Sequence, residues 1–416
     1  MDSSSMLLKG QKIYTYEGVI NGGVLIEDGR IKEILTDDKM TGYYAENIID
    51  VKDNVIIPGL IDIHVHGGGG FTAASSDISE VYGMAGYMAS RGITSYQPTT
   101  GGGFLNEIIK SLETLKVAIA NKDYLGARML GVHMEGPFLN PEKKGAFNEE
   151  LLLKPSVKLM KDFIHASGNT VTHVTLAPEL EGADEVISFL VGNNILVSGG
   201  HTNATMEETE KGINLGIRLS NHTCNAQRPI LHREIGALGA YLMDDRVDCE
   251  LICDCYHVHP DMIRMVVKMK SVNKICMISD SITAAGINPG EYFFLGHKVT
   301  VDKDGWSMLA NGTIAGSTKD LMYGLKSMVK SIGFPMEDAL IMASLNPARI
   351  CGFEKQKGSI KVGKDADITV IDDDFNVKYT IVEGKLVYDW DLKKDFRNTA
   401  LDCYRVDNIK GGGQND

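Results

Sequence analysis

The chain lacks the sequence features that mark secreted and membrane-spanning proteins. Its first residues, Met1-Asp2-Ser3-Ser4-Ser5, contain no basic segment followed by a long apolar core, so we expect no signal peptide there. No window approaches the roughly 18 apolar residues of a membrane span. The 7 cysteines are odd in number and lack CxxC spacing, which indicates buried free thiols in a reducing compartment. We therefore expect a soluble, cytoplasmic protein that does not bind membranes.

The chain also lacks the usual marks of several function classes. Its formal net charge is −13 and it has no run of Lys or Arg, which argues against a nucleic-acid partner but not against a small phosphorylated substrate. The glycine runs 67–70 and 101–103 have neither GxGxxG spacing nor a following Lys-Ser/Thr pair, so they do not predict nucleotide-phosphate loops. A serine hydrolase is disfavoured because no Gly-x-Ser-x-Gly elbow is present.

Both ends of the chain predict β structure. Short alternating apolar segments with glycine turns, including a hairpin at Asp28-Gly29, fill the first 52 residues, and the pattern returns between 366 and 387. We expect residues 1–54 and 358–405 to form one small β-sandwich domain, followed by a flexible tail at 406–416.

Apolar runs alternate with helical patterns between these ends. The runs are 55–66, 93–98, 129–135, 171–178, 195–201, 218–225, 248–257 and 275–280. The helical patterns include 104–121 and 155–166; a hairpin at 293–309 and helices at 319–332 and 336–343 follow the last run. Alternating β and α segments predict a parallel sheet, and eight strands predict an α/β fold of the (β/α)8 TIM-barrel type over 55–357. A doubly wound open sheet is the alternative.

Residues of the metal-ligand type fall at the ends of these predicted strands. His64 and His66 are two apart on one strand and so share a face, although such a pair is also found as hydrogen-bonded core histidines. The full set at predicted strand ends is His64, His66, Glu135, His201, His222 and Asp280. In a barrel these ends lie on one rim, where active sites are built.

This set predicts a metal-dependent hydrolase. Histidine with carboxylate suits Zn, Fe, Mn or Co, as one or two divalent ions, better than Ca or Mg. A metal with an open position activates water and polarises a carbonyl. Asp280 is then placed as the general base that takes a proton from the activated water and passes it to the leaving nitrogen.

Several segments resemble a known family. They are PGLIDIHVHG at 58–67, HMEGPFLN at 133–140, GHTNA at 200–204, NHTCNA at 221–226, LHRE at 231–234 and ISDS at 278–281. In this order they resemble the amidohydrolase superfamily of metal enzymes, and specifically the N-acetylglucosamine-6-phosphate deacetylases. The resemblance implies hydrolysis of the acetamide of N-acetylglucosamine 6-phosphate, giving acetate and glucosamine 6-phosphate.

The resemblance also implies residue roles. The core metal ligands would be Glu135, His201 and His222, a second metal would be held by His64 and His66, and the catalytic residue would be Asp280. The substrate-binding residues would be Ala146, Asn225, Ala226, Arg233, His257, Ile314, Ala315 and Gly316. Arg233 would contact the phosphate across a homodimer interface, and arginine is well shaped for bidentate phosphate contact.

The chain departs from the family pattern at three places. Phe147 stands where a substrate-contacting histidine is common, Gln227 stands where methionine is usual, and Ser279 and Ser281 flank Asp280 in place of Thr and Ala. The metal-ligand and base positions are intact. The alternatives are therefore an amidohydrolase acting on N-acetylgalactosamine 6-phosphate or another N-acyl substrate, and an inactive metal-binding homologue.

Overall fold

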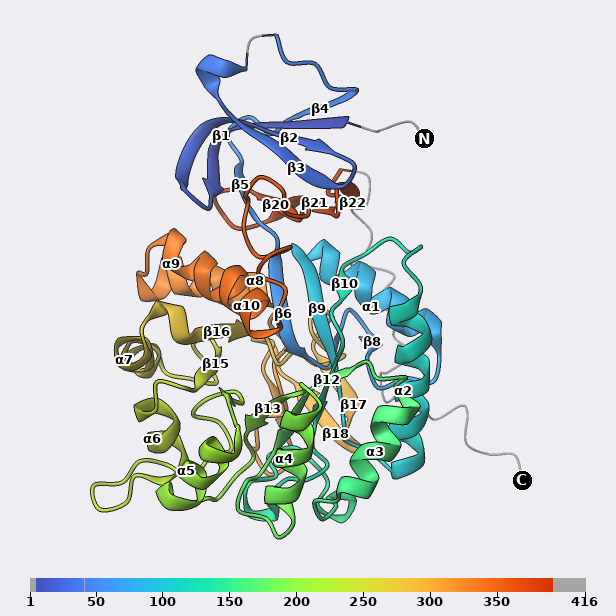
Figure 1. The fold of residues 1–416 in the computed structure, drawn as a ribbon, viewed down its shortest axis with the longest axis vertical. Helices are drawn as coiled ribbons and strands as arrows, with labels where there is room; N and C mark the ends of the chain where they lie inside the picture. Colours follow the sequence, from blue (N-terminus) through green and yellow to red (C-terminus); the bar gives the residue numbers. More distant parts are fainter. Residues whose placement is uncertain (1–4, 41, 392–416) are drawn as a thin grey trace.

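The computed structural model describes residues 5–40 and 42–391. Within these ranges the chain forms a sheet from its two ends, here called the end sheet, and a barrel (Figure 1). The strands of the end sheet are β1 (Ser5–Thr15), β2 (Gly18–Glu27), β3 (Arg30–Thr36), β4 (Asn47–Asp50), β5 (Val55–Pro58), β20 (Ile368–Ile371), β21 (Val377–Val382) and β22 (Lys385–Asp389). The predicted tail at 406–416 and the last part of 358–405 lie outside the described residues.

The barrel contains the strands between these ends. They are β6 (Leu60–Val65), β9 (Ile93–Thr100), β10 (Arg128–Met129), β11 (Val132–Glu135), β12 (Val171–Leu176), β13 (Leu196–Gly199), β14 (Leu219–Ser220), β15 (Asp248–Ile252) and β16 (Ile275–Ile278). Smaller pairings join β7 (Gly67–Gly68) to β8 (Phe71–Thr72), and β17 (Gly290–Phe294) to β18 (His297–Val301) and β19 (Ser307–Leu309).

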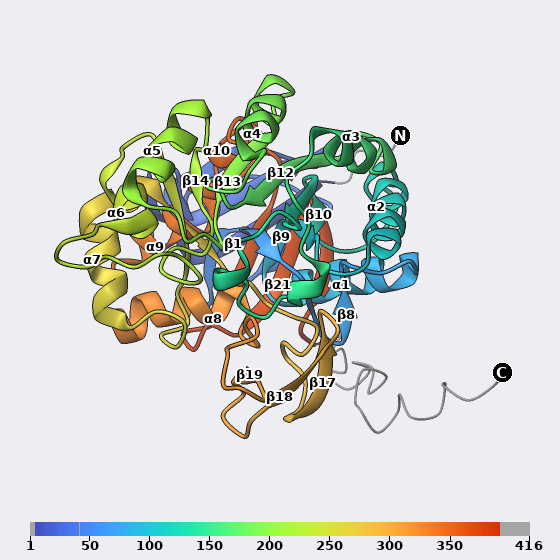
Figure 2. The same ribbon diagram turned by 90° about the horizontal axis from the view of Figure 1, so that it is seen from below.

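Helices follow most barrel strands and cover the outside of the barrel (Figures 1 and 2). They are α1 (Ile78–Ser90), α2 (Leu105–Ala120), α3 (Val157–Ala166), α4 (Ala183–Gly192), α5 (Met206–Leu215), α6 (Gly236–Met243), α7 (Pro260–Lys270), α8 (Leu321–Lys326), α9 (Met336–Leu340) and α10 (Asn346–Ile350). Short 3-10 turns lie at Asp37–Lys39, Pro141–Lys143, Glu149–Leu151 and Val272–Lys274, and π-helical turns at Ser327–Ile332 and Ile341–Leu345. None of the helices in the described ranges combines the length and apolar character that crossing a bilayer requires.

Local sequence sets where several helices begin. Thr205 and Glu208 form a capping box at the start of α5, and the Ser156 hydroxyl accepts a hydrogen bond from the Leu159 N–H at the start of α3. The helices predicted over 104–121 and 155–166 correspond to α2 and α3, each of which is two residues shorter than predicted. The predicted hairpin at 293–309 is a three-stranded antiparallel sheet, because β19 pairs with β18 after it.

The end sheet confirms that the two ends of the chain fold together. Its hydrogen-bonded order is β22-β21-β20-β5-β1-β2-β3, with β4 beside β1. The sheet folds over on itself: the Ala366 N–H donates to the Gly29 carbonyl, which joins the β2–β3 turn to the segment before β20. Apolar side chains from both ends, including Leu8, Ile56 and Val370, fill its core.

The barrel confirms the predicted (β/α)8 fold. Its parallel order runs β9-β11-β12-β13-β14-β15-β16, with β6 on the other side of β9. The ring closes between β16 and β6, where the Asp280 N–H donates to the His64 carbonyl at 3.0 Å. The carboxyl ends of the strands face away from the end sheet (Figure 1), and Figure 2 views the molecule from that side.

The prediction of one strand in the first apolar run, 55–66, is wrong, because this run forms two strands in two sheets. β5 pairs with β1 and β20 in the end sheet, whereas β6 pairs with β9 in the barrel. The change comes at Gly59, where a Cβ atom would lie 2.2 Å from Cγ2 of Thr94. Only glycine permits so close an approach. The division of the chain into domains at 54/55 and 357/358 stays a prediction.

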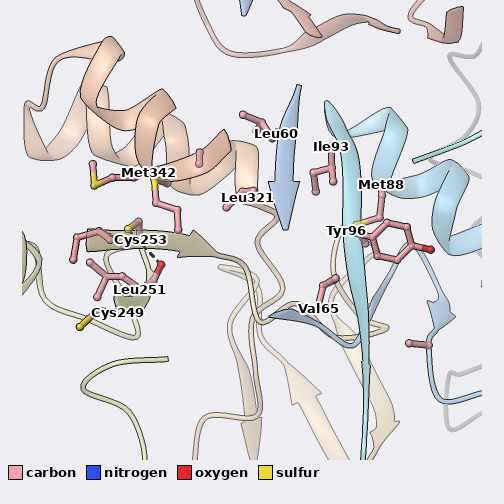
Figure 3. Packing of buried hydrophobic residues seen from close by; sticks show 14 of the residues in the cluster. Leu60, Val65, Met88, Ile93, Tyr96, Cys249, Leu251, Cys253, Leu321 and Met342 are labelled. Atoms are coloured by element: carbon pink, nitrogen blue, oxygen red, sulfur yellow. Dashed lines mark hydrogen bonds between the residues drawn. The ribbon is translucent and has the colours of Figure 1, made fainter. Parts of the chain in front are cut away.

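The main core lies between the barrel strands and their covering helices. Figure 3 shows Tyr96 of β9 beside Met88 of α1, and Leu60 of β6 near Leu321 of α8. The 6 cysteines in the described ranges are free, and Cys249 and Cys253 belong to this core. The prediction of buried free thiols is confirmed for Cys249, Cys253 and Cys276, whereas Cys224, Cys255 and Cys351 are free but only partly buried. Cys403 lies outside the described residues.

Candidate active site

All six predicted ligand-type residues lie at the carboxyl ends of barrel strands. His64 and His66 are at the end of β6, and Glu135 is the last residue of β11. His201 follows β13, His222 follows β14 and Asp280 follows β16 by two residues. Strands separated by long stretches of sequence therefore bring these side chains to one rim, as the spacing predicted.

These side chains form two groups that share Glu135. His64, His66, Glu135 and Asp280 make the first group, and Glu135, His201 and His222 make the second; in each, the ligand atoms lie within 4.8 Å of one another. In the first group, Glu135 Oε2 is 3.1 Å from His66 Nε2, and Asp280 Oδ1 is 3.4 Å from Nε2 of both His64 and His66. In the second, Glu135 Oε1 is 3.2 Å from His201 Nε2 and 3.0 Å from His222 Nε2.

Three of these residues have backbone conformations that L-amino acids rarely adopt. The φ angles are +48° at His201, +22° at His222 and +50° at Asp280. Such strain persists only where surrounding contacts over-determine the conformation, and it clusters at functional sites. The strain supports a role for this rim beyond packing.

Neighbouring groups orient the ligands. Nδ1 of His201 donates to the Lys143 carbonyl at 2.8 Å, which fixes the ring with Nε2 facing the cluster. The Asn221 amide donates to Glu135 Oε1 at 2.8 Å and accepts a hydrogen bond from the Thr175 hydroxyl at 3.1 Å. These contacts hold the shared carboxylate in one position.

The donor set fits a divalent metal. Burial by itself raises the pKa of the Glu135 carboxyl, but the imidazoles of His64, His201 and His222 hold that pKa well below its usual range. The carboxylate therefore stays charged among imidazoles. Nε2 of His222 and His201 lie 2.9 Å apart, and Nε2 of His64 is buried with no hydrogen-bond partner in the described ranges. Converging imidazole nitrogens and a charged carboxylate are the ligands that Zn, Fe, Mn and Co prefer.

A cavity of about 440 Å³ opens beside the cluster. Of the predicted substrate-binding residues, those that line it are Ala146, Asn225, Ala226, His257, Ile314 and Gly316. Ala315 is buried behind this lining, and Arg233 is exposed and does not line the cavity of its own chain. Asp280 also lines the cavity, which places its carboxylate between the cluster and the open space.

His257 is aimed into the cavity by a residue that the sequence reasoning missed. Its Nδ1 lies 2.6 Å from Asp254 Oδ2, and its buried Nε2 has no hydrogen-bond partner among the described residues. Burial opposes protonation of the ring, but the hydrogen bond and charge of Asp254 raise the pKa of His257. Asp254 follows β15 and accepts from the backbone N–H groups of Tyr256 and His257. A carboxylate three residues before a strand-end histidine was the available sequence signal.

Two further features were also missed. Glu250 is a buried carboxylate inside β15, and its position between the apolar residues Cys249 and Leu251 was a usable signal. The β17–β18 turn brings Phe294 and Leu295 to the cavity, where the Phe294 ring lies 5.4 Å from that of His66. Nothing local in the sequence indicates that this hairpin covers the site. Phe147 also lines the cavity, with its ring 5.2 Å from that of His201.

Comparison with known proteins identifies a matching family and similar relatives. Residues 55–387 match the model of the Amidohydrolase family. The chain is 34% identical to N-acetylglucosamine-6-phosphate deacetylase of Bacillus subtilis (strain 168), covering 93% of this chain and 98% of the relative. It is 32% identical to N-acetylgalactosamine-6-phosphate deacetylase of Escherichia coli O157:H7, covering 91% and 98%.

A solved structure shares the fold closely. It is a mutant N-acetyl-D-glucosamine-6-phosphate deacetylase from Mycobacterium smegmatis in complex with N-acetyl-D-glucosamine-6-phosphate. It is 27% identical with a TM-score of 0.86, covering 92% of this chain and 99% of that one.

Proposed function

The chain belongs to the amidohydrolase family, and from this premise we propose that it deacetylates N-acetylglucosamine 6-phosphate. Water adds to the acetamide carbonyl carbon, the C–N bond breaks, and acetate and glucosamine 6-phosphate leave. The observation that carries this proposal is the rim of imidazoles and carboxylates beside a cavity lined by Asn225, Ala226 and His257. The names of the relatives and of the solved complex support the substrate.

Glu135, His201 and His222 would hold a divalent ion, and His64 and His66 would hold a second ion where two bind. A bound ion supplies Lewis acidity, which polarises the acetamide carbonyl and lowers the pKa of a water molecule. The protein's own part is to present five ligand side chains in fixed orientations. The hydrogen bonds between His201 and the Lys143 carbonyl and between the Asn221 amide and Glu135 orient two of these ligands before substrate arrives.

Asp280 is the proposed general base and acid. Its side chain is 13% exposed, lines the cavity and has Oδ1 within 3.4 Å of both histidines of the first group. It would accept a proton from the attacking water and return that proton to the departing nitrogen, so that the amine leaves neutral. The low pKa that the neighbouring imidazoles give it, against the effect of burial, keeps it ready to accept.

The phosphate would be bound with help from a second copy of the chain. Arg233 is exposed and outside the cavity of its own chain, and Ile230 and Leu231 beside it expose 39% and 54% of their surface. Exposed apolar residues next to an arginine that forms no ion pair within the described ranges are typical of an interface between two copies of a chain. We propose a homodimer in which Arg233 of one protomer reaches the substrate of the other. The cysteines of the described ranges form no disulfide, which supports a cytoplasmic location for the protein.

The second candidate is deacetylation of N-acetylgalactosamine 6-phosphate or of another N-acyl substrate. Phe147 favours it, because an apolar ring lines the cavity beside His201 where the family commonly has a histidine. A relative named for the galactosamine substrate is almost as similar as the relative named for the glucosamine substrate. An inactive metal-binding homologue is disfavoured by the presence of Asp280 on the cavity wall.

Acetate release from both epimers, with and without the 6-phosphate, tests the proposal. We expect turnover of a phosphorylated sugar that stops when a chelator removes the metal and returns when metal is added. Activity that survives complete metal removal would contradict the mechanism. Preference for the galactosamine epimer would support the second candidate, and no turnover of any N-acyl substrate by the metal-loaded protein would support the inactive homologue.

A further inference from the structure

Glu250 is a charged residue in an unexpected place. It lies in the middle of β15, between Cys249 and Leu251, and its side chain is 0% exposed. Within the described ranges no Lys or Arg side chain forms an ion pair with it, and Oε1 has no hydrogen-bond partner. Burying a carboxylate is strongly unfavourable unless positive charge or hydrogen-bond donors lie close by, so the contacts of Glu250 are informative.

The other oxygen of Glu250 contacts both halves of the cluster. Oε2 lies 3.0 Å from Nδ1 of His64 and accepts a hydrogen bond from the His222 N–H, also at 3.0 Å. His64 belongs to the group that includes Asp280, and His222 belongs to the group that includes His201. A single atom therefore supports one ligand from each group.

Each contact has a defined consequence for metal binding. A histidine can offer only a nitrogen that carries no proton, so an acceptor at Nδ1 keeps the proton there and leaves Nε2 of His64 free. At His222 the backbone has the rare φ of +22°, and its N–H is held by the same oxygen. Glu250 thus sets the tautomer of one ligand and the backbone position of another.

We propose that Glu250 is a positioning residue shared by the two halves of the metal centre. It does not line the cavity, so it acts through His64 and His222 and not on the substrate. The proposal rests on the metal centre of the proposed function. A dication bound at this centre would place further positive charge close to the buried carboxylate.

Asp62 offers a matched control. It is also 0% exposed, lies on β6 and has a carboxylate oxygen, Oδ2, without a hydrogen-bond partner among the described residues. Its Oδ1 accepts from the backbone N–H groups of His64 and Ser279, each at 3.3 Å, and its carboxylate hydrogen-bonds to no imidazole of residues 5–40 and 42–391. The two residues differ in whether the carboxylate reaches a ligand ring.

The experiment compares metal affinity in the full-length protein and the variants Glu250→Gln and Asp62→Asn. Each protein is stripped with a chelator, titrated with Zn²⁺ against a chromophoric competitor, and checked for stoichiometry. We expect Glu250→Gln to bind about 10–100-fold more weakly, the usual effect of removing a ligand's hydrogen-bonded carboxylate. Asp62→Asn should stay within about threefold of the parent, a bound set by the absence of an imidazole contact.

The outcomes separate the two proposals. Metal binding by the parent with an unchanged affinity in Glu250→Gln overturns the role of Glu250 and leaves the proposed function standing. A parent protein that binds no metal overturns both. An equal loss in Asp62→Asn also overturns the inference, because any buried carboxylate would then suffice.

A measurement on the unmutated protein covers the case in which Glu250→Gln does not fold. In the metal-loaded parent, nitrogen-15 spectra of labelled histidine should show His64 with its proton on Nδ1, assigned by loss of the signal in His64→Gln. A His64 that carries its proton on Nε2 would overturn the proposal.

Discussion

Two regions of this molecule bury charged groups, and they balance them differently. At the junction of the end sheet and the barrel, Lys357 Nζ lies 2.8 Å from Asp367 Oδ2 and 3.1 Å from Asp365 Oδ2. Glu383 is shared there between Lys357 and Arg128, the latter with Nε at 2.8 Å. At the barrel rim, Glu135 and Asp280 are surrounded by imidazoles, and the described residues place no Lys or Arg ion pair on either carboxylate.

The comparison separates structural charge from functional charge. At the junction, burial opposes the charge on Lys357, yet Asp367 and its neighbours raise the pKa of its ammonium, so the cluster is balanced within the chain. At the rim the carboxylates face imidazoles and no Lys or Arg of the described ranges, an arrangement that a bound dication would complete. A buried ion cluster that contains its own cations therefore indicates stability, and one that lacks them indicates a ligand.

Metal removal should have the largest effect on activity, because we expect the cluster at the barrel rim, and not the cluster at the junction, to bind an added cation. We expect acetate release to fall by about a thousandfold or more, the equivalent of several kcal/mol of lost charge stabilisation. Added Zn²⁺ or Mn²⁺ should restore it. Assays before and after dialysis against chelator measure this, and an unchanged rate with metal analysis at zero would refute it.

Asp280→Asn should remove proton transfer while leaving most of the metal ligands in place. We expect kcat to fall by about 10²–10⁴-fold, the usual contribution of a general acid or base. Metal content should persist at the Glu135, His201 and His222 group. Steady-state kinetics with metal analysis on the same sample tests this, and a variant that keeps kcat would require another base.

Lys357→Met should affect stability and not chemistry. Removing the ammonium leaves Asp365 and Asp367 without their buried partner, which should lower the free energy of unfolding by about 3–5 kcal/mol. Urea unfolding measures the change, with the exposed Lys355→Met as the control, which should stay within about 0.5 kcal/mol. A large loss of kcat in folded Lys357→Met would contradict the separation of the two clusters.

Phe147→His should have the smallest effect, because it alters the cavity wall and neither charge cluster. We expect the ratio of kcat/KM for the glucosamine over the galactosamine substrate to rise by about tenfold, the size of one added polar contact. Competition assays with both epimers measure the ratio. An unchanged ranking would show that Phe147 does not select the sugar.

Much of the fold and of the site could be predicted from local pattern. The alternation of apolar runs with helical segments predicted the barrel, because each strand and helix has its own period in the sequence. His64, Glu135, His201 and Asp280 were found because ligand-type residues at strand ends are brought together by any closed parallel barrel. The split of one predicted strand at Gly59 was missed, because the two halves pair with strands that are distant in the sequence.

The sequence by itself determined the order of strands and helices and the chemical types at the rim, since both follow from spacing along the chain. The tertiary structure alone decided which atoms meet. Glu250 reaches His64 across 186 residues, and the β17–β18 turn brings Phe294 over the cavity. Such contacts depend on how the barrel closes and how side chains pack, and no local pattern encodes that geometry.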